Sequence, residues 1–143
     1  MSERNQAERP SALAEALARV GDRWTLLIVQ ALLGEPRRFN DLQADIPGIA
    51  PNILSERLKR LERDALVRSR LYTDRPPRAA YELTAEGQEL AGALRLLAHW
   101  GARHAVPSEV RHPECGTPLE ARWYCPTCDH LVEGEPERET RFL

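Results

Sequence analysis

The spacing of apolar residues predicts two helices in the first quarter of the chain. Residues 11–20 repeat apolar side chains at helical intervals and stop at Gly21. A second helix is predicted over residues 23–33, with Asp22 placed to cap its first turn. Because this second helix is apolar on nearly every side, it should lie buried at the centre of the fold.

Two more helices are predicted on either side of a Pro-Gly turn. Asn40 is the expected N-cap of a short helix over residues 41–46. The following helix should begin at Pro51, because proline suits the first helical position, and end near Ala65. Its apolar stripe, which must face the core, consists of Leu54, Leu58 and Leu61.

The pattern then changes to the two-residue period of a β-strand. Residues 66–73 alternate apolar and polar side chains, DRPPR should form a turn, and residues 79–84 should form the returning strand. Thr84 is the expected cap of a last, long helix that runs to about His104. This order of elements is that of a winged helix-turn-helix.

The composition is that of an ordinary soluble domain. The chain has 143 residues, 42% of them hydrophobic, and a formal net charge of −2, so any nucleic-acid surface must be a local basic patch. The N-terminal MSERNQAERP lacks the apolar centre of a signal peptide, and the apolar run Leu26 to Leu33 is too short to span a bilayer. We therefore expect a cytoplasmic protein without membrane contact. No catalytic triad, carboxylate pair or phosphate-binding glycine loop stands out, so we do not expect an enzyme.

Polar and basic residues gather on the fourth helix, opposite its leucines, and on the hairpin. Between Pro51 and Tyr81 eight basic side chains stand against four acidic ones, a local net charge of +4. Asn and Ser near the start of such a helix can bond base edges, Lys and Arg can meet phosphates, and arginines on a stiff turn suit a narrow minor groove. A solvated surface is the alternative for a charged helix face, but the order of elements favours DNA. The residues expected to contact DNA are Pro51, Asn52, Ser55, Glu56, Lys59, Arg60, Arg63, Arg75 and Arg78.

Several segments resemble the HxlR-type branch of the MarR-like winged helix regulators. They are GDRW, RRF followed by PGI, the leucine-striped fourth helix, RPPR in the wing, and HWG, in order between residues 11 and 101. The resemblance implies a homodimeric, sequence-specific transcription regulator. We expect it to repress by occupying a promoter, although the sequence itself does not separate repression from activation. In this family the first and last helices build the dimer interface, and packing within one chain is the alternative for each residue there. The resemblance assigns to that interface Leu13, Leu17, Leu94, Leu97 and Trp100.

One position departs from the family pattern. Many members carry a cysteine before the first helix, and some use it to sense oxidants or electrophiles, whereas this chain has Ser11 at the matching position. A serine hydroxyl has no comparable thiolate chemistry. The resemblance therefore allows a small-molecule or redox effector, but not one sensed by a thiol at this position.

All three cysteines lie in the stretch HPECGTPLEARWYCPTCDH. His112-x-x-Cys115 and Cys125-x-x-Cys128 are two ligand pairs separated by nine residues. Each pair is followed by Gly or Asp, residue types that can adopt the left-handed backbone that closes a turn around a metal. Three thiolates and one imidazole suit a tetrahedral structural Zn²⁺, which we expect as the cofactor.

Three alternatives stay open for this stretch. His130 could replace His112 as a ligand. The CPTC segment resembles the active site of thiol–disulfide oxidoreductases, but without a βαβ pattern a redox role reduces to release of zinc on oxidation. The module could also dock another protein, in which case the chain would act as a zinc-ribbon adaptor.

The predicted fold is therefore mainly α with a small β-hairpin wing, followed by a small Cys3His zinc-ribbon-like module. The domain boundary is expected at Pro107-Ser108. The expected parts are a disordered N-terminus (1–10), a winged helix-turn-helix domain for DNA binding and dimerisation (11–106), the zinc-ribbon-like module (107–132) and an acidic flexible tail (133–143).

Overall fold

The computed structural model describes residues 10–102 and 111–132. Its internal contacts divide the chain into two units, Met1–Leu94 and Arg95–Leu143, and each is described by itself. The expected boundary at Pro107-Ser108, the residues before 10 and the tail from residue 133 lie outside the described residues.

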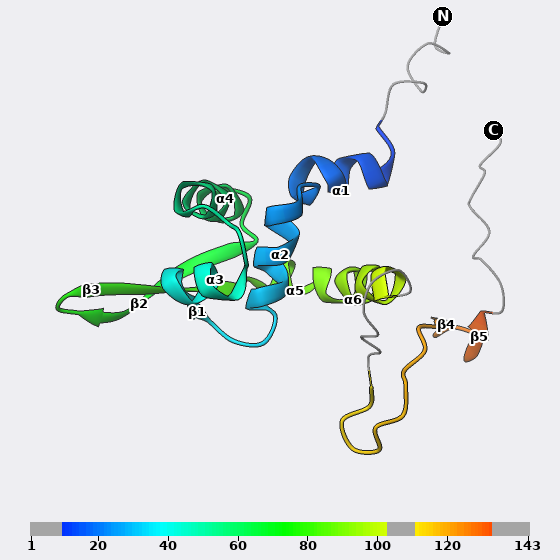
Figure 1. The fold of residues 1–143 in the computed structure, drawn as a ribbon. Helices are drawn as coiled ribbons and strands as arrows, with labels where there is room; N and C mark the ends of the chain where they lie inside the picture. Colours follow the sequence, from blue (N-terminus) through cyan, green and yellow to red (C-terminus); the bar gives the residue numbers. More distant parts are fainter. Residues whose placement is uncertain (1–9, 103–110, 133–143) are drawn as a thin grey trace, which may run out of the picture. The chain divides into compact units, whose positions relative to one another are not determined.

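From residue 10 onward, four helices precede the wing (Figure 1): α1 (Ala12–Val20), α2 (Arg23–Leu32), α3 (Phe39–Asp45) and α4 (Pro51–Arg63). Capping side chains mark where the first two begin. The Ser11 hydroxyl accepts the N–H of Ala14, and the Asp22 carboxylate accepts the N–H groups of Trp24 and Thr25. These bonds satisfy N–H groups that have no partner inside a helix. Both helices therefore begin where the sequence predicts.

The start of α3 differs from the prediction. Asn40 is the second helical residue and not the cap, because the helix begins at Phe39, two residues before the predicted start at Asp41. Arg38 occupies the N-cap position, and the Asp41 carboxylate accepts its N–H at 3.2 Å. Arg37 and Arg38 also form a strand, β1, which was not predicted, because two residues are too few to show an alternating pattern.

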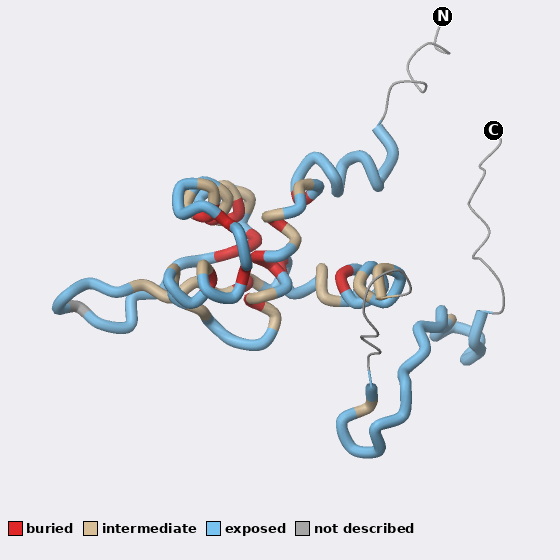
Figure 2. The backbone as a smooth tube through the Cα atoms, viewed as in Figure 1, coloured by how far each residue is buried: buried red, intermediate tan, exposed pale blue. Residues whose placement is uncertain are grey.

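The wing belongs to a three-stranded antiparallel sheet in the order β1-β3-β2. The strands β2 (Val67–Asp74) and β3 (Pro77–Leu83) form the predicted hairpin, and β1 (Arg37–Arg38) pairs with β3. The hairpin extends away from the helices in Figure 1, and its tip is exposed in Figure 2. The tip is therefore available to another molecule.

The core of the first unit lies where α2, α3 and α4 pack together and against the sheet (Figure 2). Four residues of α2 are buried, which confirms its predicted central position. They are Thr25, Ile28, Val29 and Leu32. From α4, Leu54, Leu58 and Leu61 enter the same core with at most 1% of their surface exposed.

The long helix predicted after the wing is interrupted. Thr84 caps α5 (Ala85–Gln88) by accepting the N–H of Gly87, and α6 (Leu90–Ala102) follows. Glu89, between them, keeps helical angles of φ −62° and ψ −22°, but its N–H bonds to the carbonyl three residues back, as in a 3₁₀ turn. His104, the expected end, lies outside the described residues. No helix within residues 10–102 or 111–132 combines the length and the hydropathy of a membrane span.

Beyond α6, the described part of the second unit consists of two tight hairpins. An antiparallel bridge between Arg111 and Pro118 closes the first. The second pairs β4 (Trp123–Cys125) with β5 (His130–Val132). No described residue between 111 and 132 is buried, so these hairpins contain no apolar core of their own.

Asp22 also joins α2 to α4. Its Oδ1 accepts a hydrogen bond from Nε of Arg57 at 3.1 Å, and its Oδ2 accepts one from the hydroxyl of Thr25 at 2.5 Å. Burial by itself would raise the pKa of Asp22, but the hydrogen bonds from Thr25 and Arg57 outweigh it and hold that pKa below its ordinary value. The charged carboxylate therefore fixes α4 to the start of α2.

Replacing Asp22 with alanine should lower the free energy of unfolding by about 2 kcal/mol, because it removes a helix cap and leaves the Arg57 guanidinium without this partner. Asp22→Asn is the matched control, since asparagine caps a helix but carries no charge, and it should lose less. Chemical denaturation at neutral pH measures both variants. An alanine variant as stable as the wild type would contradict this role.

The lowered pKa of Asp22 also fixes the sign of its contribution to the pH dependence of stability. The contribution is present above the pKa of an unfolded aspartate and is lost as the pH falls through the lower pKa of the folded state. Between about pH 7 and about pH 3 the free energy of unfolding should therefore fall less in Asp22→Asn than in the wild type. Denaturation curves across that range test this, and equally steep losses would show that Asp22 contributes nothing.

Candidate nucleic-acid interface

Helix α4 presents a polar face opposite the three leucines that anchor it in the core. This face is exposed except for Ser55, which is half-buried. It consists of Asn52, Ser55, Glu56, Lys59 and Arg63. The helix is therefore divided into an inner and an outer side as its leucine spacing predicts.

The first turn of α4 is open to solvent. Ile49, just before the helix, is buried and holds this end against the core, while Pro51 and Asn52 are exposed. Ala50 at the N-cap has no side chain that could bond the first N–H groups. The amide of Asn52 therefore stands at the leading end of the helix, where recognition helices contact base edges.

The basic side chains of α4 fall into two groups. Arg57 and Arg60 contact the rest of the domain: Arg57 bonds Asp22, and Arg60 donates to the carbonyl oxygen of Ala18, near the end of α1, at 2.5 Å. Lys59 and Arg63 make no hydrogen bond or ion pair within the described part of the chain. Two of the predicted DNA-contacting cations thus face solvent, whereas Arg60 also holds α1 in place.

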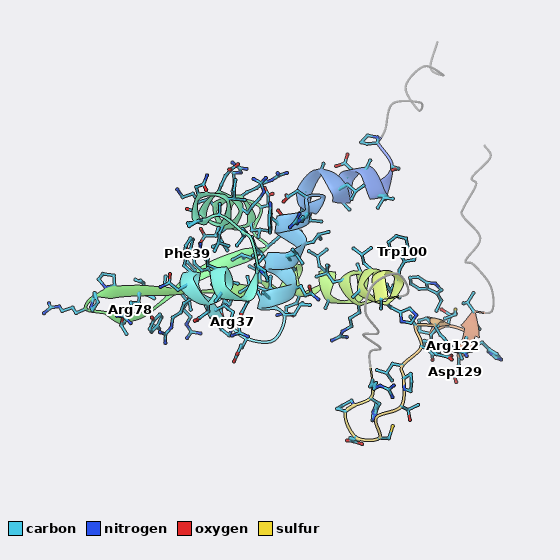
Figure 3. All side chains as sticks on the ribbon, in the orientation of Figure 1. Arg37, Phe39, Arg78, Trp100, Arg122 and Asp129 are labelled. Atoms are coloured by element: carbon cyan, nitrogen blue, oxygen red, sulfur yellow. The ribbon has the colours of Figure 1, made fainter. Side chains whose placement is uncertain are left out.

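The wing carries both of its predicted arginines on the exposed end. Arg75 lies in the turn and Arg78 is the second residue of β3, which Figure 3 marks on the hairpin. The hydroxyl of Thr73 donates to the carbonyl oxygen of Pro76 at 2.8 Å and ties the turn together. Arg68, nearer the base of the wing, is paired with Glu82 at 2.7 Å. The two arginines at the tip are therefore held on a braced turn.

A further basic group, which the sequence did not predict, lies where β1 meets the wing. The guanidinium of Arg38 stacks over the ring of Tyr72, 4.9 Å from its centroid. The two side chains line a groove together with Asn40 and Arg78. Only the pairing of β1 with β3 brings Arg38 beside the hairpin, so no local sequence signal could have indicated this group.

The four predicted metal ligands lie in the second unit as two pairs. Nδ1 of His112 lies 3.5 Å from Sγ of Cys115, and Cys125 interacts with the thiol of Cys128. All three cysteines are free thiols. Among the described residues no three His, Cys, Asp or Glu side chains lie close enough together to hold a metal, so the two pairs are not joined into one site. His130 instead contacts the carbonyl oxygen of Cys128 through Nδ1.

The residues expected at a dimer interface separate into two kinds. Leu94 is buried in the core of its own chain, the alternative left open for it. The other four are exposed: Leu13 (67%) and Leu17 (53%) on α1, and Leu97 (50%) and Trp100 (56%) on α6, where Figure 3 labels the tryptophan. Large apolar side chains left exposed in one chain are typical of association surfaces.

Comparison with known proteins agrees with this geometry. Residues 19–109 match the family model of the HxlR-like helix-turn-helix. The HTH-type transcriptional regulator YvaP of Bacillus subtilis is 35% identical over 104 residues, which are 73% of this chain and 96% of YvaP.

Solved structures show the same fold. The reduced form of the transcriptional regulator YodB from Bacillus subtilis matches with a TM-score of 0.58 and 29% identity, over 71% of this chain and 99% of YodB. A transcription factor from Pseudomonas aeruginosa matches with a TM-score of 0.62 and 27% identity, over 90% of this chain and 94% of its own. The chain therefore belongs to the HxlR-like helix-turn-helix family of transcriptional regulators, which are not enzymes.

Proposed function

We propose that the protein regulates transcription by binding a specific double-stranded DNA site through α4 and the wing. The observation that carries the proposal is the exposed polar and basic face of α4, held on a buried leucine stripe. A helix anchored in this way can enter the major groove without losing its fixed position in the domain.

The residues on the outer face of α4 have different tasks. Asn52 and Ser55 read base edges, because an amide bonds adenine bidentately and a hydroxyl bonds either partner of a base pair. Glu56, paired with Arg57 at 3.0 Å, offers an acceptor for the amino group of cytosine. Lys59 and Arg63 neutralise phosphates, which sets the affinity and its salt dependence more than the choice of sequence.

The wing adds contacts beside the major groove. Arg75 and Arg78, held on the braced turn, suit the negative potential of a narrow minor groove. Arg38, stacked on Tyr72, extends the basic surface from the wing toward the start of α3. A phosphate that follows the groove between them would meet cations from two elements.

The proposed active form is a homodimer. Its proposed contacts are the exposed apolar side chains Leu13 and Leu17 on α1, and Leu97 and Trp100 on α6. Two-fold symmetry would present two copies of α4 to a pseudo-palindrome. Half-sites would lie one helical turn apart, about 34 Å. Occupation of such a site in a promoter would make the protein a repressor.

An effector, if one acts on this protein, does not act through a thiol before α1. Ser11 stands there, and its hydroxyl accepts the N–H of Ala14 at 3.1 Å as a helix cap. Oxidation of a thiol at this position therefore does not regulate the protein.

The proposal includes a zinc-ribbon-like module after the winged domain. Its support is the pair of hairpins within residues 111–132: His112 and Cys115 lie in the first, while Cys125 ends β4 and Cys128 lies in the turn of the second. The role of the module is structural, and DNA contact is left to α4 and the wing.

Changing Asn52 and Ser55 together to alanine should reduce discrimination between the operator and a scrambled duplex by about 1–3 kcal/mol for each base that is no longer read. Affinity for the scrambled duplex should change little, because the bonds to phosphates remain. Fluorescence anisotropy with DNA from upstream of the protein's own gene measures both affinities.

Lys59→Ala is the companion variant. It should weaken binding to both duplexes alike and reduce the slope of log K against log salt by about 1. Arg95→Ala, which removes one exposed cation from α6, is the control for net charge and should leave the slope unchanged. If the double alanine variant discriminates between the operator and the scrambled duplex as well as the wild type does, α4 is not the helix that reads the bases.

Leu17→Glu and Leu97→Glu should each shift the chain from dimer to monomer, since each would place a charge in a desolvated interface. Leu71→Glu is the matched control, because this leucine of the wing is 64% exposed and lies outside the proposed interface. Size-exclusion chromatography with light scattering gives the molar mass. A wild-type monomer, or dimers that survive both glutamates, would contradict the interface.

A further inference from the structure

Two turns in the second unit each place a residue with a left-handed backbone directly after two predicted ligands. In the first, the N–H of Gly116 donates to the carbonyl oxygen of His112 at 2.8 Å, and Gly116 has φ +68°. In the second, the turn between β4 and β5 places Asp129 at φ +55°. In both, the left-handed residue directly follows a pair of possible ligands spaced by two residues, as the sequence predicts.

The left-handed backbone at Asp129 is informative because it is unfavourable for a residue with a Cβ. The local contacts hold it: the hydroxyl of Tyr124 donates to the Asp129 carboxylate at 2.5 Å, and Cys125 pairs with His130 across the strands. A residue type that tolerates this conformation thus stands at the same place in both turns. Each of these residues directly follows the second of two predicted ligands, Cys115 in the first turn and Cys128 in the second.

The distance inside the first pair matches a zinc site. Nδ1 of His112 and Sγ of Cys115 are 3.5 Å apart. A tetrahedral Zn²⁺ with Zn–S of about 2.3 Å and Zn–N of about 2.0–2.1 Å places such atoms about 3.6 Å apart. The first turn therefore already has the spacing of two ligands on one ion.

The described part of the two hairpins buries no apolar core. Within residues 111–132 the large apolar side chains are exposed: Leu119, Trp123, Tyr124, Leu131 and Val132, each at 41% or more. Two short hairpins without a buried core do not hold together by hydrophobic burial. Small modules of this kind commonly obtain their folding free energy from a structural metal.

The segment also has a counterpart in a solved structure. The match to the Pseudomonas aeruginosa transcription factor covers 90% of this chain, so it must include residues beyond 109, where the family model ends. The match shows that such an extension occurs in another protein and says nothing of a metal there.

We propose that residues 112–128 bind one structural Zn²⁺ through His112 Nδ1 and the thiolates of Cys115, Cys125 and Cys128. The ion joins the two preformed pairs, which do not meet in the described structure. Binding releases three thiol protons and leaves a site of net charge −1. The inference rests on the proposed zinc-ribbon-like module and not on DNA binding.

The geometry favours His112 over His130 as the fourth ligand. His112 already lies at ligand spacing from Cys115, whereas Nδ1 of His130 is engaged with the carbonyl oxygen of Cys128. The two histidines therefore form a matched pair for the test, since each is one residue of the same short module.

The test is the zinc content of the purified full-length protein after dialysis, measured by plasma mass spectrometry, without DNA. The wild type should hold about one zinc per chain, as a single four-ligand site requires. Cys125→Ser and Cys128→Ser should lose the zinc. His112→Asn should weaken zinc affinity by more than the roughly 10- to 100-fold loss that is typical when a residue bonded to a metal ligand is replaced. His130→Asn should keep the zinc. Cobalt replacement adds a readout of ligand type, since thiolate-to-cobalt absorption should fall when any one cysteine is replaced.

Several results would overturn the proposal. One is a wild-type protein that contains no zinc, and another is full zinc content in Cys115→Ser. A third is loss of zinc in His130→Asn together with full zinc content in His112→Asn, which would make His130 the fourth ligand. Far-UV circular dichroism of each variant checks that the helices of the first unit are intact, so that zinc loss is not a consequence of general unfolding. Because no DNA is present, failure of the DNA-binding proposal leaves this result unchanged.

Discussion

The hydrogen bonds of one carboxylate hold together the parts of the winged domain that would meet DNA. Asp22 caps α2 through Trp24 and Thr25 and accepts a hydrogen bond from Arg57 of α4. The lowered pKa of Asp22 shows that these donors outweigh the cost of its partial burial. Because α2 forms the centre of the core, this bond fixes the angle at which α4 leaves it. The outer face of α4 is useful for recognition only while that angle is constant.

Helix α4 thus has three sides that differ in their surroundings: one is buried, one bonds to other helices and one faces solvent. Its leucines are buried, Arg57 and Arg60 bond α2 and α1, and the outer side keeps polar and basic groups in solvent. Burial supplies stability, the inner arginines supply orientation, and the outer side remains for contact with DNA. The wing repeats this division, since Arg68 pairs with Glu82 at its base while Arg75 and Arg78 stay exposed at its tip. The two units rely on different forces as well: the first buries leucines, whereas the hairpins of the second bury none of the residues described.

Much of this could be predicted because the signals are local. Helical spacing located α1, α2 and α4, and the caps Asp22 and Thr84 were found from residue type and position alone. The errors came where a distant partner decides the outcome. Arg38 pairs with Ala80 of β3 and is also the N-cap of α3, so the helix begins at Phe39. The sequence around Asn40 gives no sign of this distant strand, and the cap was therefore predicted at Asn40. The stack of Arg38 on Tyr72, which was not predicted, has the same origin.

The sequence by itself determined the order of helices and strands, which side of α4 faces the core, and the spacing of the two ligand pairs. Each of these follows from residue types a few positions apart, where periodicity and turn chemistry act. Only the tertiary structure decided which charged side chains of α4 bond to other helices and which face solvent. Arg57 and Arg60 look like Lys59 and Arg63 in sequence, yet the first two bond α2 and α1 while the others face solvent. The reason is that an ion pair depends on the distance between two side chains that the fold brings together. The local sequence pattern does not determine that distance.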